Sequence, residues 1–273
     1  MTIKTWLDES TKSLKKSGIE TSRLDALILL EDTLGKDRAW LLAHDETDLS
    51  EKNVDSLNIL LEQRLNQTPL AYLREKAEFY GRNFVISRYV LVPRPESEAM
   101  IDQLKIIADN LSKDSHTPRI LDVGTGSGAL AVTAALELKQ ASVDALDNDP
   151  KTLKVAASNV DLFTQSISVF ESDLLSNIRD FYDILLCNLP YVPDDFKINK
   201  AAKHEPTQAI FGGHDGLDLY RKLFKQVVLL SEKPLYILTE SLPEQHTVLA
   251  SIASLASYKL TKTDDFIQVF KLA

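Results

Sequence analysis

The sequence predicts an α/β protein in which a small α-helical bundle and a β-hairpin precede a mostly parallel sheet with helices on both faces. Three features of the 273-residue chain point to this fold class. The first ~70 residues show helical periodicity without β-branched runs, and apolar strand-like runs then alternate with helical patterns. Glycine is scarce, with nine residues, and six of them fall in two short clusters. We expect a helical domain over 1–76, a hairpin linker over 77–95 and an α/β domain over 96–273.

The N-terminal domain is expected to contain four helices. Two of them should stop at Gly18 and Gly35, because glycine readily adopts the left-handed conformation that ends many helices. Ser50 should cap the last helix, since its hydroxyl can accept a hydrogen bond from a free backbone N–H. The expected spans are 3–17, 22–35 and 38–42, followed by a longer helix that carries Val54, Leu57, Leu61 and Leu65 on one face.

The linker region changes from helical to extended patterns. Residues 79–86 are expected to form a hairpin that turns at Gly81. Residues 90–92 form a short extended run, and Pro95 suits the first turn of the helix that follows. That helix is expected over 96–111, and a polar connection over 113–118.

The remainder alternates strands with helices, which predicts parallel strands joined by crossover helices. The strand candidates are short apolar runs bounded by turn residues. They span 119–123, 142–147, 167–170, 182–188, 234–240 and 266–271, and helices fit at 129–139, 150–160, 216–231 and 244–256.

The bulk composition excludes several classes of protein. Apolar residues make up 44% and charged residues 26%, as in ordinary soluble domains. No stretch approaches the ~20 apolar residues of a membrane span, and the N-terminus lacks a secretory apolar region. Cys187 is the single cysteine, so a disulfide framework or multi-cysteine zinc site within the chain is excluded, and we expect a cytoplasmic protein without a metal site. The net charge of −9 is spread evenly, which disfavours direct nucleic-acid binding.

The first glycine cluster follows a predicted buried strand and opens a helix. Its residues run from Asp122 to Gly128, and a ligand lying over such a turn needs the close backbone approach that glycine permits. The next predicted strand ends at Asp147, where a carboxylate can hold both hydroxyls of a ribose. This combination predicts a nucleotide-binding site, to which we assign Asp122, Gly124, Thr125, Gly126, Ser127, Gly128 and Asp147.

The type of nucleotide follows from charge rather than from glycine spacing. Ala129 could complete a dinucleotide fingerprint, so spacing alone leaves NAD open. A carboxylate at Asp122 better suits a cationic ligand, such as the amino group or sulfonium of S-adenosylmethionine. Asp173, followed by Leu174 after the third predicted strand, is positioned to meet the adenine edge. We therefore expect S-adenosylmethionine as the cofactor.

The fourth predicted strand of this region ends in the tetrapeptide Asn188-Leu189-Pro190-Tyr191, beside the same crevice. Here the sequence resembles the amino-methyltransferases that carry Asn-Pro-Pro-Tyr after strand four, and more closely the release-factor glutamine methyltransferases (HemK/PrmC type). The resemblance extends over nearly the whole chain. It includes residues 91–98, similar to a Pro-Arg-Pro-Glu-Thr-Glu signature, and residues 205–216, similar to the family's Glu-Pro loop.

The resemblance implies a Rossmann-like class I methyltransferase domain, a substrate-recognising N-terminal domain, and a peptide chain release factor as protein substrate. We expect a monomer. The methyl group would pass to the amide nitrogen of the glutamine in a Gly-Gly-Gln motif. Asn188, Leu189, Pro190 and Tyr191 would form the catalytic site, with Asn188 also touching the cofactor. Three departures are present: Leu189 replaces the first proline, Glu75 replaces a glycine, and residues 264–269 lack the expected glycine and arginine.

An amide nitrogen is a weak nucleophile because its lone pair is delocalised into the carbonyl. Acceptors for both N–H bonds turn the lone pair toward the methyl group. The side-chain oxygen of Asn188 can be one acceptor and the backbone carbonyl of Leu189 the other, although leucine lacks the fixed φ of proline. The ring of Tyr191 can pack on the planar amide and exclude water.

Three other functions remain open from the sequence. An adenine amino-methyltransferase acting on DNA or RNA could use the same tetrapeptide, although it would need a basic face. A donor-binding protein with reduced activity is suggested by Leu189, and a nicotinamide dehydrogenase by the glycine spacing. Cys187 is expected in the core, and Arg94, Glu96 and Glu98 either border the cofactor site or cap a helix.

Overall fold

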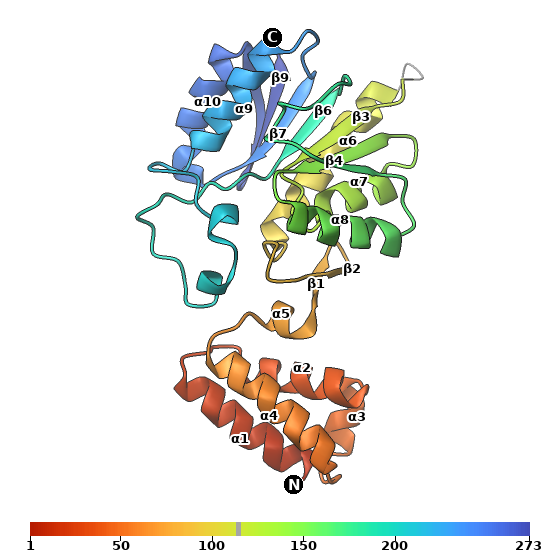
Figure 1. The fold of residues 1–273 in the computed structure, drawn as a ribbon, viewed down its shortest axis with the longest axis vertical. Coiled ribbons are helices and arrows are strands. Elements are labelled where there is room, and N and C mark those ends of the chain that lie inside the picture. The colour runs from red at the N-terminus through yellow and green to blue at the C-terminus, as the bar shows by residue number, and fades with distance from the viewer. Residues whose placement is uncertain (113–115) are drawn as a thin grey trace. The chain divides into compact units, whose positions relative to one another are not determined.

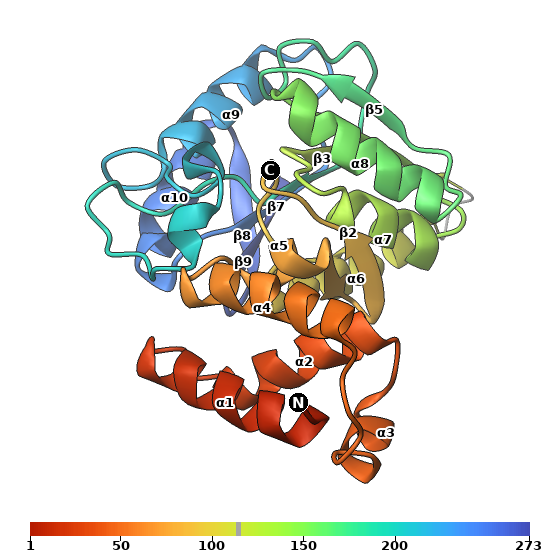
Figure 2. The ribbon, with the colours of Figure 1, turned by 60° about the horizontal axis from the view of Figure 1, so that its bottom comes forward.

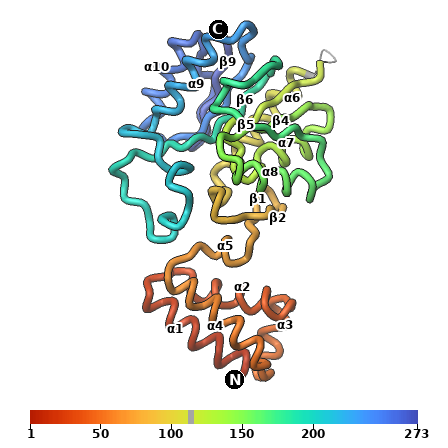
Figure 3. Tube along the Cα trace, in the orientation of Figure 1, coloured from red at the N-terminus to blue at the C-terminus, as the bar shows by residue number. Residues whose placement is uncertain are grey.

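The computed structural model describes residues 1–112 and 116–273, so part of the connection expected at 113–118 lies outside the described residues. Two compact units are present (Figure 1): Met1–Lys76 with Ile198–His204, and Ala77–Lys197 with Glu205–Ala273. The Cα trace in Figure 3 shows Ile198–His204 within a long loop of the chain. Along the described ranges, no helix combines the length and the apolar character needed to cross a membrane.

The first unit is a helical bundle built around apolar side chains. Trp6, Leu14, Leu30 and Leu57 are each almost fully buried in its core. The Ser50 hydroxyl accepts from the N–H of Asn53, as expected for a helix cap. The helices are α1 (Ile3–Lys16), α2 (Ser22–Leu34), α3 (Arg38–Ala43), α4 (Glu51–Leu65) and α5 (Leu70–Arg74), of which α5 was not expected.

The second unit is an α/β domain preceded by the hairpin β1 (Lys76–Phe79) and β2 (Arg82–Val85). Its seven-stranded sheet has the order β5-β4-β3-β6-β7-β9-β8. The pairs among β3 to β7 are parallel, and β9 is antiparallel to both of its neighbours, β7 and β8. The strands are β3 (Arg119–Val123), β4 (Ser142–Asp147), β5 (Ser168–Glu171), β6 (Ile184–Cys187), β7 (Tyr236–Glu240), β8 (Tyr258–Asp264) and β9 (Ile267–Leu272). The helices are α6 (Glu98–Ser112), α7 (Ala129–Glu137), α8 (Pro150–Leu162), α9 (Asp218–Leu229) and α10 (His246–Leu255).

Both faces of the central strands are buried. Alternate residues of a strand point to opposite faces, so Leu185 and Cys187 share a core with residues of α9 and α10, while Ile184 and Leu186 face the other side. Figure 2 shows α7 and α8 on one side of the sheet and α9 and α10 on the other. The predicted α/β architecture with a mostly parallel sheet is therefore confirmed.

Three elements differ in detail from the sequence expectations. Residues 90–92 join no strand, because Val90 N closes a turn onto Ser87 O and Val92 N donates to the Glu205 carboxylate. The helix expected from residue 96 begins at Glu98, after a 3-10 turn over Pro95–Ser97. The edge strand β8 was missed, because most of its side chains are exposed and polar and so give no apolar signal.

Candidate active site

A pocket opens at the carboxyl ends of β3, β4 and β6, where ligands bind in open parallel sheets. The sequence-predicted residues that line it come from the loops after these strands and after β5. They are Gly124, Thr125, Gly126, Ser127, Asp147, Asp173, Leu174, Asn188, Leu189 and Pro190. Asp122, Gly128 and Tyr191 are not among the residues that line it.

The glycine loop is held by the carboxylate of Asp147. All three glycines of the first cluster have positive φ, a backbone conformation that favours glycine. Gly126 N donates to Asp147 Oδ2 at 3.1 Å, and Asp149 N donates to Oδ1 at 3.2 Å. Burial raises the pKa of Asp147 while these backbone bonds oppose the rise. Since a carboxylate offers about four acceptor sites, Asp147 keeps capacity for a ribose hydroxyl.

Asp122 lies beneath the same loop and is 1% exposed. Its Oδ2 accepts from Thr125 Oγ1 at 2.6 Å and from Ala131 N at 3.2 Å, which joins the loop to the start of α7. Its Oδ1 is buried and accepts no hydrogen bond within the described residues. Burial raises the pKa of Asp122 to about 7, so a nearby cation would stabilise the charged form.

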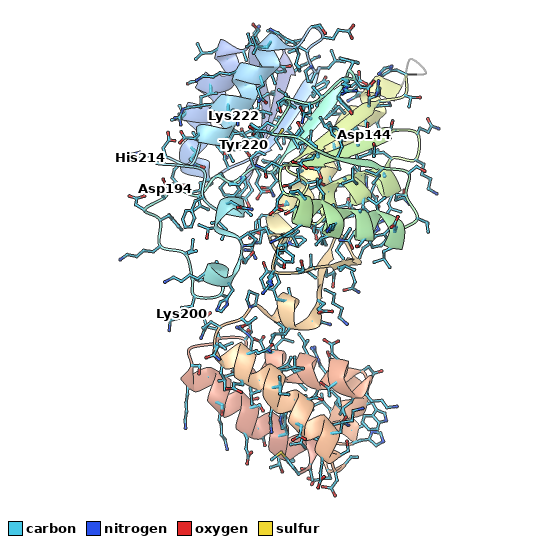
Figure 4. All side chains as sticks on the ribbon, viewed as in Figure 1. Asp144, Asp194, Lys200, His214, Tyr220 and Lys222 are labelled. Atoms are coloured by element: carbon cyan, nitrogen blue, oxygen red, sulfur yellow. The ribbon has the colours of Figure 1, made fainter. Side chains whose placement is uncertain are left out.

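Asp173 lines the pocket and forms an ion pair with Lys222. Lys222 projects from α9, where Figure 4 labels it. The Asp173 side chain is about half exposed and its carbonyl accepts from Gln226. Leu174 is buried beside it, with φ of 50°. An adenine edge that met Asp173 would therefore compete with Lys222 for this carboxylate.

The side chain of Asn188 has a single orientation fixed by acceptors. Its Nδ2 donates to Ser97 Oγ at 2.8 Å and to Glu240 Oε2 at 3.0 Å. Its Oδ1 accepts no hydrogen bond from the described part of the chain, and Asn188 lines the pocket. With Nδ2 held by these two acceptors, the amide keeps its oxygen free as an acceptor.

Leu189 is buried and makes two contacts that a proline would change. Its N–H donates to the Tyr220 hydroxyl at 3.3 Å, a bond that proline cannot form. Its Cδ2 lies 3.0 Å from the position of a Cβ on Gly124, so the leucine packs against the glycine loop. Leucine at this position thus has packing of its own, in place of the rigidity of proline.

Leu189→Pro should destabilise the chain by about 1 kcal/mol, because the Tyr220 bond is lost and the smaller ring leaves space beside Gly124. We expect turnover to change by less than tenfold, since the carbonyl of residue 189 is retained. Thermal unfolding and initial-rate kinetics measure the two effects. In a Tyr220→Phe background the hydrogen-bond part of the stability loss should disappear. Equal losses in both backgrounds would contradict this account.

The second glycine cluster supports the backbone of the tetrapeptide. A Cβ on Gly212 would overlap the carbonyl oxygen of Pro190, and one on Gly216 would overlap the carbonyl of Tyr191. The Gln245 side chain donates to the same Tyr191 carbonyl at 2.7 Å and to Asp215 O at 2.7 Å. These glycines therefore let the 205–216 loop lie directly against residues 188–191.

Tyr191 is anchored through its hydroxyl, which donates to Glu240 Oε1 at 3.0 Å. Burial and the Glu240 carboxylate raise the pKa of Tyr191, so the phenol stays neutral. Cys187 is fully buried in the core, as expected, and this burial raises the pKa of its thiol.

Sequence reasoning missed four residues of this network: Ser97, Tyr220, Glu240 and Gln245. A signal for Glu240 was present, because it ends a predicted parallel strand at the edge where ligands bind. Arg94, left open above, lines the pocket and pairs with the buried Glu205 at 2.6 Å. Glu98 instead accepts from Tyr80 N at 2.7 Å, so it fixes the hairpin.

The residues present fit S-adenosylmethionine. Gly124 and Gly126 let a ligand approach the loop backbone closely, and Asp147 offers free acceptor sites. The unpartnered Oδ1 of Asp122 lies in a buried position that favours a nearby positive charge. A dinucleotide pyrophosphate would bring negative charge toward the same carboxylate, which disfavours NAD.

The fold and this site define the protein as a class I methyltransferase with S-adenosylmethionine as methyl donor. Two family profiles match the chain: "PrmC N-terminal domain" over residues 5–74 and "Methyltransferase small domain" over residues 97–210. The chain belongs to the release factor glutamine methyltransferase family.

Three curated relatives carry the name "Release factor glutamine methyltransferase". The protein of Buchnera aphidicola is 32% identical over 86% of this chain and 83% of its own length. The Koribacter versatilis protein is 34% identical over 83% and 81%, and the Coxiella burnetii protein 35% identical over 77% and 76%.

Solved structures support the fold at low sequence identity. A methyltransferase from Pyrococcus furiosus has a TM-score of 0.52 at 16% identity, covering 71% of this chain and 91% of that one. The hMettl16 catalytic domain, solved with an RNA hairpin, has a TM-score of 0.55 at 13% identity, covering 80% and 82%. At these identities the likeness concerns the fold alone.

Proposed function

We propose that this chain transfers a methyl group from S-adenosylmethionine to the side-chain amide nitrogen of the glutamine in the Gly-Gly-Gln motif of peptide chain release factors. The observation that carries the proposal is the fixed amide of Asn188, whose Nδ2 is held by Ser97 and Glu240 and whose side chain lines the pocket together with Leu189. The family to which the chain belongs supplies the substrate class.

Two acceptors match the two N–H bonds of a primary amide. With both N–H bonds engaged by Asn188 Oδ1 and the Leu189 carbonyl, the amide is held so that the nitrogen lone pair, which stands perpendicular to the amide plane, points at the methyl group. One N–H proton leaves after the transfer. Bound S-adenosylmethionine supplies a methyl group on a positively charged sulfur. The contribution of the chain is positioning, which can lower a barrier by roughly 7–11 kcal/mol when the reacting atoms are well oriented.

The other residues that the sequence analysis assigns to the site have supporting roles in this proposal. Tyr191 covers the substrate amide with its ring and keeps water out, and Pro190 limits the backbone after Leu189. The donor lies over the Gly124–Gly128 loop, with its ribose on Asp147 and its positive end near Asp122. Asp173 and Leu174 border the adenine.

The proposal also assigns roles to the parts of the chain. Residues 1–76 recognise the release factor, residues 77–95 link the two parts, and residues 96–273 carry the reaction. The chain works as a monomer in the cytoplasm, where translation ends. Light scattering of the purified chain tests the oligomeric state.

Purified chain, labelled S-adenosylmethionine and a release factor with an intact Gly-Gly-Gln motif should give methyl incorporation at that glutamine, located by peptide mass spectrometry. The same factor with the glutamine changed to glutamate is the matched control and should remain unlabelled. An adenine-containing oligonucleotide in a parallel reaction should also remain unlabelled. Label in the oligonucleotide and none in the release factor would replace this proposal with nucleic-acid methylation.

A further inference from the structure

We propose that Glu240 is a positioning residue that holds the Asn188 amide with its oxygen toward the substrate and tethers the Tyr191 ring. The inference rests on the proposed function, in which Asn188 accepts a hydrogen bond from the substrate amide. It adds a carboxylate from a strand that the tetrapeptide motif does not include.

The sheet register brings Glu240 to Asn188. In the parallel pair β6 and β7, Cys187 lies opposite Thr239, so the next residue of each segment is Asn188 and Glu240. Ser97, in the turn before α6, reaches the same point, where its hydroxyl donates to Glu240 Oε2 at 2.6 Å. Three segments far apart in sequence therefore converge on one carboxylate.

Each contact of this carboxylate comes from a donor. Ser97 Oγ and Asn188 Nδ2 approach Oε2, and the Tyr191 hydroxyl approaches Oε1. An ionised carboxylate can only accept, so it requires the NH₂ side of the Asn188 amide. A flipped amide would place two acceptor oxygens together and turn a donor toward the pocket, which would oppose the donor N–H of a substrate amide.

Because Glu240 is buried, its preference for one orientation of the Asn188 amide is strong. Glu240 is 1% exposed, and a buried carboxylate is costly unless hydrogen bonds satisfy it. Its backbone carbonyl also accepts from the Tyr220 hydroxyl at 2.6 Å, so the strand end cannot shift freely. The acceptor is therefore rigid, and it transmits a fixed orientation to both Asn188 and Tyr191.

A reciprocal exchange of groups tests this assignment. Asn188→Asp places a second carboxylate beside Glu240 and should lose activity strongly, because like charges at this distance force one group to take up a proton. Adding Glu240→Gln restores the hydrogen bond with the roles exchanged: the new amide at position 240 donates to the new carboxylate at position 188. The second oxygen of that carboxylate then faces the pocket. The double variant should turn over at least about tenfold faster than Asn188→Asp alone.

Glu240→Gln alone should lower kcat about tenfold, because its amide no longer selects one orientation of Asn188, while KM for the release factor and Kd for S-adenosylmethionine stay within about twofold. Glu244→Gln, an exposed change of the same chemistry four residues later, should leave all three constants unchanged. Should Glu240→Gln fail to fold, Ser97→Ala removes one member of the network and should lower kcat with the same unchanged Kd.

Two results would overturn the assignment: a double variant no faster than Asn188→Asp alone, or a Glu240→Gln effect that falls on Kd instead of kcat. Failure of the proposed function would be seen differently, because the wild-type chain itself would then leave the release factor unmethylated. Calorimetric titration with S-adenosylmethionine and thermal unfolding of every variant separate both results from a loss of folding.

Discussion

Asn188→Ala should lower the turnover number for release-factor methylation about 10²- to 10³-fold, the loss typical of removing one preorganised polar group from an active site. The alanine removes the Oδ1 acceptor that faces the pocket. It also leaves Ser97 and the buried Glu240 without the Nδ2 donor, which should destabilise the fold by about 1 kcal/mol. Single-turnover kinetics with saturating donor, together with thermal unfolding, measure these effects.

Asn83→Ala is the matched control for this prediction, because Asn83 is an exposed residue of β2 away from the pocket. It should leave both turnover and unfolding unchanged. Most of the loss in Asn188→Ala should fall on kcat, since glycine-loop contacts to the donor remain. A variant that keeps most of the wild-type turnover would show that the Leu189 carbonyl alone is sufficient to orient the substrate.

The buried strands of the sheet could be predicted from the sequence because each is a short apolar run bounded by turn residues. β6, for example, is fully buried along its length. The edge strand β8 could not, since its stability comes from pairing with β9 rather than from its own apolar face. The short helix α5 has only five residues, too few for a periodic signal.

Two of the departures from the family pattern lie in turns of the structure. Glu75 caps α5 in the left-handed conformation, with φ of 54°, where glycine would be less strained. Asp265 has φ of 49° in the turn between β8 and β9, near the missing C-terminal glycine. Both positions lie in turns, so these departures concern backbone strain rather than the pocket.

The local parts of the site could be predicted, and its long-range support could not. The glycine loop and the tetrapeptide are continuous segments whose chemistry is visible in a few residues. The Asn188–Glu240 bond joins residues 52 positions apart, and only the strand order reveals it. The second glycine cluster is a similar case. Its positions require glycine because a Cβ there would overlap carbonyl groups of a segment more than twenty residues earlier.

Gly216→Ala should destabilise the second unit by about 2–4 kcal/mol, the sum of a left-handed backbone and an overpacked contact. Gly216 has φ of +79°, and a Cβ there would overlap the Tyr191 carbonyl and the Gln245 amide. The Tyr191 carbonyl is backbone and cannot rotate away, so the tetrapeptide itself must shift. Turnover should fall at least about tenfold, because small displacements of catalytic groups cost up to 100-fold.

Gly81→Ala separates the two causes, because Gly81 has φ of +71° but faces open space in the hairpin of the same unit. It should lose about 1–2 kcal/mol through backbone strain, with turnover unchanged. Denaturant unfolding and methylation kinetics of both variants give the comparison. If Gly216→Ala lost no more stability than Gly81→Ala and kept its turnover, the second glycine cluster would not support the catalytic segment. A selective loss in Gly216→Ala would instead assign this cluster to holding Tyr191 and its neighbours in place.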